Sequence, residues 1–121
     1  LKLDRYGDIW CNFFLKKILD ATGDRVAIGV PLVDHRREPR PTMVDFEKEF
    51  WGVTVSQQLF EVVEEHDLSG KNYADLYIDL VQQLETHEIH PNINIRKYFQ
   101  RLFRSMKNWV TILEKLRILD S

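Results

Sequence analysis

The stretch YADLYIDLVQQL, residues 73–84, carries the pattern that decides the fold. Its apolar residues recur at steps of three and one, which places them on one face of an α-helix: Tyr73, Leu76, Tyr77, Leu80, Val81 and Leu84. After His90-Pro91 the same spacing returns in a longer run: Phe99, Leu102, Phe103, Met106, Trp109, Val110, Leu113 and Leu116. We therefore expect two amphipathic helices that pack against each other.

Charge separates along the same two segments. Residues 61–90 are mainly acidic and residues 96–117 mainly basic. Neighbouring antiparallel helices of complementary charge would give this pattern, each surface pair contributing at most about 1 kcal/mol. A basic face for an acidic partner or a phosphate-bearing ligand would give it as well. The aromatic residues occupy the apolar stripe instead of alternating with the bases, which does not favour a nucleic-acid binder.

The first part of the chain has a mixed pattern. Asp8 is expected to cap a helix that carries apolar residues at helical spacing and ends at Gly23. Residues 26–33 are apolar and rich in β-branched side chains, which predicts a short buried strand that kinks or ends at Pro31.

The pattern changes near Gly52. Before it, prolines favour a loop over residues 34–42. After it, a helix is expected over residues 55–65, followed by a turn at residues 67–70 and then by the two amphipathic helices.

Size and composition limit the functions that come into question. The chain has 121 residues, 44% hydrophobic and 30% charged, as one modest globular domain has. Its net charge, 17 − 19 = −2, predicts neither a nucleic-acid nor an anionic-membrane partner, and no apolar run reaches the roughly 20 residues of a transmembrane segment. The single Cys11 excludes an internal disulfide and indicates a reducing, cytoplasmic setting. Because the chain begins at Leu1 without Met, we expect it to be part of a longer protein.

The chain has four histidines, whose neutral imidazoles are candidate metal ligands. His35 follows the expected strand and precedes several arginines. This group suits a metal–phosphate ligand, but the residues alone favour a solvated basic loop. His66 ends an acidic helix, where a capping role suffices. His87 and His90 are three residues apart, but Pro91 disfavours helix at His90, so their spacing does not favour a metal site.

The motif RYGDIWC, residues 5–11, concentrates charged and aromatic side chains. It suits a capped helix with a stapling Trp, or a carboxylate that acts as a base or holds a hydroxyl beside an aromatic sugar platform. The sequence holds no Ser/His/Asp elbow, P-loop, GxGxxG or CxxC, so the corresponding enzyme classes lack support.

This motif resembles the R-Y-D-D-M-W-A-G segment of the reversibly glycosylated polypeptide family, whose best-known members are UDP-arabinopyranose mutases. Residues 29–35 are similar to the family's G-L-P-Y-I-W-H strand, Pro41 stands where its S-N-P-F loop has proline, and residues 46–52 are similar to L-K-K-E-Y-K-G. The helical tail resembles the family more loosely, at Tyr77, Leu80, Tyr98, Phe99, Met106 and Trp109.

The resemblance implies a mainly α chain with a small β element, the helical carboxyl-terminal portion of a GT-A-like α/β glycosyltransferase fold. Residues 1–52 would be the end of the catalytic domain, and residues 53–121 a helical region packed as one unit with it. The implied function is that of a nucleotide-sugar-dependent glycosyltransferase or a UDP-sugar mutase. Its partner would be a nucleotide sugar, and its divalent cation Mn or Mg. No DxD motif occurs in this chain, so we expect the isolated chain to be inactive.

Site residues follow from the same resemblance. It implies that Asp8 and Arg5 are catalytic residues near the sugar, and that His35 is a metal ligand. Substrate-binding roles fall on Trp10, Tyr6 and Arg37. Gly7 stands where the family has its first acidic residue, which puts a paired-carboxylate mechanism in question. The alternative function is a non-catalytic helical interaction domain, whose two stripes build a homo-oligomer.

Overall fold

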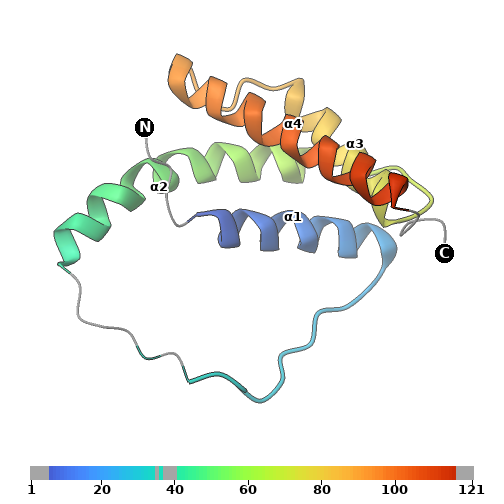
Figure 1. Cartoon of the computed structure of the whole chain (residues 1–121), viewed down its shortest axis with the longest axis horizontal. Helices are drawn as coiled ribbons and strands as arrows, with labels where there is room; N and C mark the ends of the chain where they lie inside the picture. Colours follow the sequence, from blue (N-terminus) through green and yellow to red (C-terminus); the bar gives the residue numbers. More distant parts are fainter. Residues whose placement is uncertain (1–5, 35, 37–40, 117–121) are drawn as a thin grey trace.

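Helices account for all regular structure in the described residues, which are 6–34, 36 and 41–116 without the side chain of Lys48. In this computed structural model they are α1 (Gly7–Thr22), α2 (Thr42–Glu65), α3 (Tyr73–Glu85) and α4 (Ile93–Lys115). Figure 1 shows α3 and α4 as a hairpin packed over α1 and α2. Because α3 contacts each of the other three helices, it forms the centre of the bundle. The mainly α prediction is confirmed.

The two predicted stripes meet inside the bundle. From α3 the buried residues are Leu76, Leu80, Val81 and Leu84, and from α4 they are Ile95, Phe99, Phe103, Met106 and Val110. Trp109 and Leu116 are 57% and 63% exposed, although the spacing placed them in the stripe. Both lie in or directly after the last two turns of α4, where Trp109 stands beside Tyr73 and Tyr77 of α3 and remains partly open to solvent.

The start of α1 differs from the prediction. Tyr6 is the N-cap, with the Trp10 N–H donating to its carbonyl at 2.9 Å, whereas Asp8 lies in the first turn. The Asp8 carboxylate accepts the N–H of Ile9 at 3.0 Å and does not cap the helix. A carboxylate there is still favourable, because the first turn is the positive end of the helix dipole. The predicted end at Gly23 is confirmed, with φ at 78°.

The second helix is longer than predicted. α2 begins at Thr42, directly after Pro41, and one continuous helix crosses Gly52. Its first half carries exposed apolar side chains in place of an apolar stripe, which is why the spacing predicted only residues 55–65. Those exposed residues are Met43, Val44, Phe46, Phe50 and Val53.

The predicted buried strand at residues 26–33 is wrong for this structure. The segment is irregular and exposed, up to 100% at Ile28, and Figure 1 shows it leading away from the helices. A strand needs a neighbouring strand for its backbone hydrogen bonds, and the described part of the chain contains none.

Candidate functional site

The residues of the RYGDIWC motif separate at the start of α1. Trp10 is buried, and its indole N–H donates to Ser56 Oγ at 2.8 Å, which in turn donates to the Gly52 carbonyl at 2.6 Å. Asp8 is exposed at the surface. Arg5 lies outside the described residues. The structure therefore makes Trp10 an anchor of α1 in the core, and its geometry gives no support to a sugar platform at that residue.

Tyr6 packs over α2 and is half-buried. Its ring stands 6.0 Å from the Trp10 ring and lies directly above Gly52. Burial, and to a lesser degree the negative charge of Glu49, raises the pKa of the Tyr6 phenol. The phenol is therefore protonated at neutral pH and able to donate a hydrogen bond at the edge of α2.

The predicted metal and diphosphate residues cannot be placed in the fold. His35 and Arg37 lie outside the described residues. Their neighbour Arg36 is exposed and pairs with Asp34 at 2.8 Å across two residues of the same loop. An exposed pair of this kind contributes little to stability, so the described part of the loop does not by itself define a binding site.

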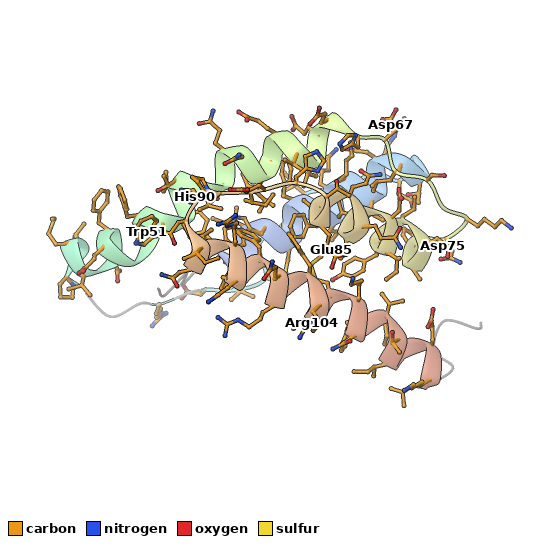
Figure 2. The ribbon with its side chains drawn as sticks, turned by 90° about the horizontal axis from the view of Figure 1, so that it is seen from above. Trp51, Asp67, Asp75, Glu85, His90 and Arg104 are labelled. Atoms are coloured by element: carbon orange, nitrogen blue, oxygen red, sulfur yellow. The ribbon has the colours of Figure 1, made fainter. Side chains whose placement is uncertain are left out.

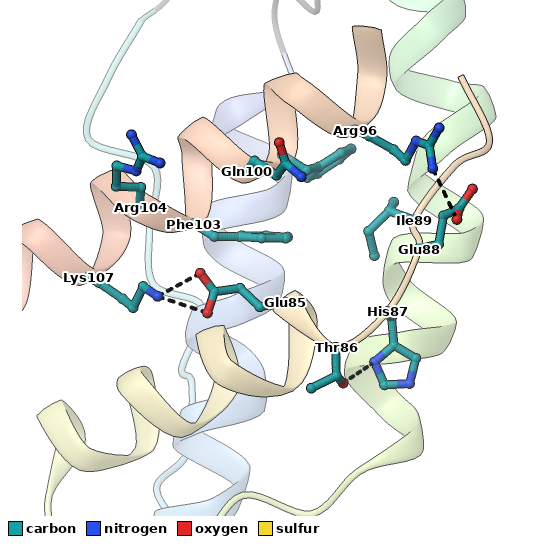
Figure 3. Close-up of a pocket in the computed structure, with 11 residues that line it drawn as sticks. Glu85, Thr86, His87, Glu88, Ile89, Arg96, Gln100, Phe103, Arg104 and Lys107 are labelled. Carbon is teal, nitrogen blue, oxygen red and sulfur yellow. Dashed lines mark hydrogen bonds and ion pairs between the residues drawn. The ribbon is translucent and has the colours of Figure 1, made fainter. Parts of the chain in front are cut away.

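A groove of about 640 Å³ runs between α4 and the connection that follows α3 (Figure 3). Its walls carry three bases and two acids, 3 − 2 = +1: Arg96, Arg104, Lys107, Glu85 and Glu88. Lys107 bridges Glu85 at 2.7 Å and Arg96 bridges Glu88 at 3.3 Å. These bridges support complementary charge between neighbouring segments as the source of the separated acidic and basic runs.

Among the described residues that line the groove, Arg104 is the remaining cation. It is exposed on α4. With the two other bases neutralised by Glu85 and Glu88, the groove offers one guanidinium to an anion, fewer cationic groups than a diphosphate-binding clamp would use.

A smaller apolar cavity of about 170 Å³ lies between α1, α3 and α4. Its lining includes Cys11, Tyr77 and Tyr98 and has no acidic or basic side chain. Burial, and then the negative charge of the nearby Cys11 sulfur in its ionised form, raises the pKa of both tyrosines. An uncharged apolar cavity with neutral phenols suits a small apolar group and does not suit a diphosphate.

Two histidines meet where α2 and α3 end. The Nε2 atoms of His66 and His87 are 3.3 Å apart, and Glu65 completes a cluster whose candidate ligand atoms lie within 4.8 Å of one another. His90 does not join His87: its ring contacts Trp51, as Figure 2 shows, and its Nδ1 accepts the Asn92 N–H. Sequence spacing missed this pair because 21 residues separate its members. The one sequence feature that could have indicated the pair is that His66 and His87 each come just after the end of a helix.

The described residues do not fit the Mn or Mg that the family resemblance implies. Hard cations prefer several carboxylate and carbonyl oxygens, and in nucleotide sites they share phosphate oxygens with the substrate. The one cluster of three ligand-type side chains in the described part of the chain holds two imidazoles and a single carboxylate. Imidazole suits Zn, Cu and Ni better.

The sequence comparisons identify the family of this helical bundle. The model of the reversibly glycosylated polypeptide family matches residues 1–118, so the chain belongs to that family. The family resemblance inferred from the motifs is thereby confirmed.

Several plant proteins are similar to the chain over nearly all of its length. UDP-arabinopyranose mutase 1 of Arabidopsis thaliana is 25% identical over 116 residues, which are 94% of this chain and 31% of that protein. Probable UDP-arabinopyranose mutase 1 of Solanum tuberosum is 24% identical over 98% of this chain and 32% of its own length. The chain thus spans about a third of the curated relatives it matches. No solved structure matches it significantly.

Among the described residues, no helix combines the length and the apolar composition that a bilayer span requires.

Proposed function

We propose that this chain acts as part of a UDP-sugar mutase, a protein that interconverts the ring forms of a sugar held on UDP. The observation that carries the proposal is the family match over residues 1–118, together with the mutase names of the relatives. Nucleotide-sugar transfer is the related activity that the same resemblance implies.

Within this proposal, the first turn of α1 presents Asp8 to the sugar. The carboxylate is exposed at the positive end of the helix, and α1 is fixed below it by the buried Trp10–Ser56 hydrogen bond. Trp10 then serves as a positioning residue. Arg5 would contact the sugar beside Asp8, and Tyr6 is expected to supply a phenol at the same edge.

The loop after residue 34 is the proposed diphosphate side. His35 would ligate Mn or Mg and Arg37 would contact the diphosphate, as the resemblance implies. A divalent cation held by His35 would supply positive charge beside the diphosphate, and the Arg37 guanidinium would do the same. We also propose a reducing, cytoplasmic location, which suits the single exposed Cys11 and is testable by fractionation.

The activity test uses the natural full-length protein. UDP binding is measured by calorimetry with and without Mn²⁺, and conversion of UDP-arabinopyranose is followed by chromatography. Asp8→Asn should lower turnover by about 10²-fold or more, the usual contribution of a positioned acid or base. Asp20→Asn, an exposed carboxylate on the same helix, is the matched control and should leave turnover unchanged.

His35→Ala should weaken UDP binding in the presence of Mn²⁺ and have little effect without it. Absence of UDP binding by the full-length protein would overturn the proposed function. Equal turnover in Asp8→Asn and the parent protein would remove Asp8 from the site and leave the family assignment standing.

The alternative, a helical interaction domain, gains no support from the stripes that suggested it. Most residues of the two stripes are buried within one chain, although Tyr73, Trp109 and Leu116 stay exposed. The buried residues are therefore not free to form a homo-oligomer in this arrangement. Light scattering of the chain measures directly whether another surface does so.

A further inference from the structure

The cluster of Glu65, His66 and His87 joins two ends of the bundle. Glu65 is the last residue of α2 and His66 is its C-cap. His87 follows the C-cap of α3 by one residue. Both helices thus end at this cluster, and the negative ends of their dipoles favour a positive charge. The imidazoles are half-buried and Glu65 is exposed, so the cluster is partly shielded and still accessible from solution.

The hydrogen bonds of His87 fix its tautomer. Its Nδ1 lies 2.9 Å from the carbonyl of Gln83 and 3.0 Å from Thr86 Oγ1. The Thr86 hydroxyl itself donates to that carbonyl at 2.7 Å. Nδ1 must therefore carry the proton and donate it, which leaves the lone pair of Nε2 directed at His66. Ligating histidines typically donate the other ring N–H to a backbone carbonyl in this way.

The separation of the two imidazoles fits a shared ion. Two nitrogens on a tetrahedral Zn²⁺ at 2.0–2.1 Å each are about 3.3–3.4 Å apart. The Nε2 atoms of His66 and His87 are 3.3 Å apart, longer than the roughly 2.9–3.0 Å usual for a hydrogen bond from an N–H group. Neutral His66 can carry its proton on Nδ1, which frees its Nε2 as a ligand. The flexible Glu65 side chain lies close enough for its carboxylate to reach the same point.

We propose that Glu65, His66 and His87 form a binding site for Zn²⁺ or a similar first-row transition-metal ion. The ion cross-links the end of α2 to the connection between α3 and α4. Three protein ligands leave the fourth tetrahedral position to water. This site is distinct from the Mn or Mg site of the proposed function, because its imidazole-rich ligands suit a softer ion and it uses neither Asp8 nor His35.

The test uses the whole 121-residue chain in a Cys11→Ser background, which removes the exposed thiol as a competing ligand. Zn²⁺ affinity is measured by calorimetry against a chelator, and Co²⁺ absorption reports the coordination geometry. We expect one ion per chain and a tetrahedral Co²⁺ spectrum. His66→Ala and His87→Ala should each lower the affinity at least about 10- to 100-fold, since even loss of an outer-shell partner costs that much.

Matched controls lie beside the cluster. His90→Ala removes a histidine of the same connection that contacts Trp51 instead, and Glu64→Gln removes the exposed carboxylate next to Glu65. Both should leave Zn²⁺ affinity unchanged, whereas Glu65→Gln should lower it. Unfolding is followed in parallel: Zn²⁺ should raise the Tm of the parent chain, and much less that of His66→Ala.

Absence of stoichiometric Zn²⁺ binding, or equal affinity in His66→Ala and the parent chain, would overturn the proposal. Should His87→Ala fail to fold, Glu65→Gln decides the matter, because an exposed side chain at a helix end can be changed without loss of the core. None of these measurements involves UDP-sugar turnover, so a negative result here leaves the proposed function unaffected, and the reverse holds as well.

Discussion

Because Gly52 has no side chain, the residue that begins α1 can pack directly on the backbone of α2. The ring of Tyr6 occupies the space that a Cβ at position 52 would take, and the carbonyl of Gly52 accepts the Ser56 hydroxyl that holds Trp10. Glycine inside a helix ordinarily costs up to about 1 kcal/mol relative to alanine. In α2 the contact of the Tyr6 ring with Gly52, which holds the start of α1 against α2, offsets this cost.

Gly52→Ala should therefore destabilise the chain, although alanine is the better helix former. We expect a loss of about 1–3 kcal/mol in the free energy of unfolding, as for overpacking at a tight contact, measured by urea denaturation. Gly7→Ala is the control: apart from its chain neighbours and its own helix backbone, nothing lies within 4 Å of its Cβ position, and the substitution should be neutral or stabilising. In a Tyr6→Ala background the sign of Gly52→Ala should reverse. A stabilising Gly52→Ala in the parent chain would contradict the Tyr6 packing.

At the scale of elements, one polar contact links the end of α1 to the start of α3. Asp24, just after α1, accepts hydrogen bonds from the hydroxyls of Thr22 and Tyr73. The Thr22 bond, and then the Tyr73 bond, lowers the pKa of Asp24, while Asp24 raises the pKa of Tyr73. The Asp24 contribution to stability is present above its unfolded-state pKa and is lost as pH falls through the folded value. The Tyr73 contribution is present below its unfolded-state pKa and is lost as pH rises through the folded value.

Tyr73→Phe should raise the pKa of Asp24 toward its ordinary value, as followed by NMR titration of the carboxyl carbon. Thr22→Val should raise the same pKa further, because the Thr22 bond is the larger cause. Tyr98→Phe serves as the control, since that phenol lies in the apolar cavity with Cys11. An Asp24 pKa that does not respond to Tyr73→Phe would show that α1 and α3 are not linked at this contact.

Elements with one continuous apolar face were predictable from the sequence. α3 was predicted nearly residue by residue, because its stripe reports burial directly. The first half of α2 was not, since its apolar side chains are exposed and have no helical stripe. The meeting of His66 with His87 was equally beyond local spacing, because it depends on how α2 and the connection after α3 are placed in space. The sequence motif indicated both Asp8 and Trp10 as site candidates. It could not predict that the Asp8 carboxylate is exposed and the Trp10 indole buried, which depends on how α1 packs.

For the whole molecule, the fold predicts an order of local stability. α3 is at the centre of the bundle and its inward residues are almost fully buried, so its amides should exchange most slowly with solvent. Residues 25–34 have no regular structure and are exposed throughout, so their amides should exchange nearly as fast as in a free peptide. Hydrogen exchange with mass spectrometry on the 121-residue chain measures both.

The same experiment on the natural full-length protein tests why residues 26–33 have the composition of a buried strand. Exposed valines and isoleucines are unfavourable in water, and a neighbouring sheet would both bury them and satisfy their backbone groups. Strong protection of 26–33 in the full-length protein, with fast exchange in the 121-residue chain, is the result expected if the GT-A-like sheet implied by the resemblance supplies that neighbour. Fast exchange in both would separate this segment from any sheet and confine the ordered fold of this region to its helices.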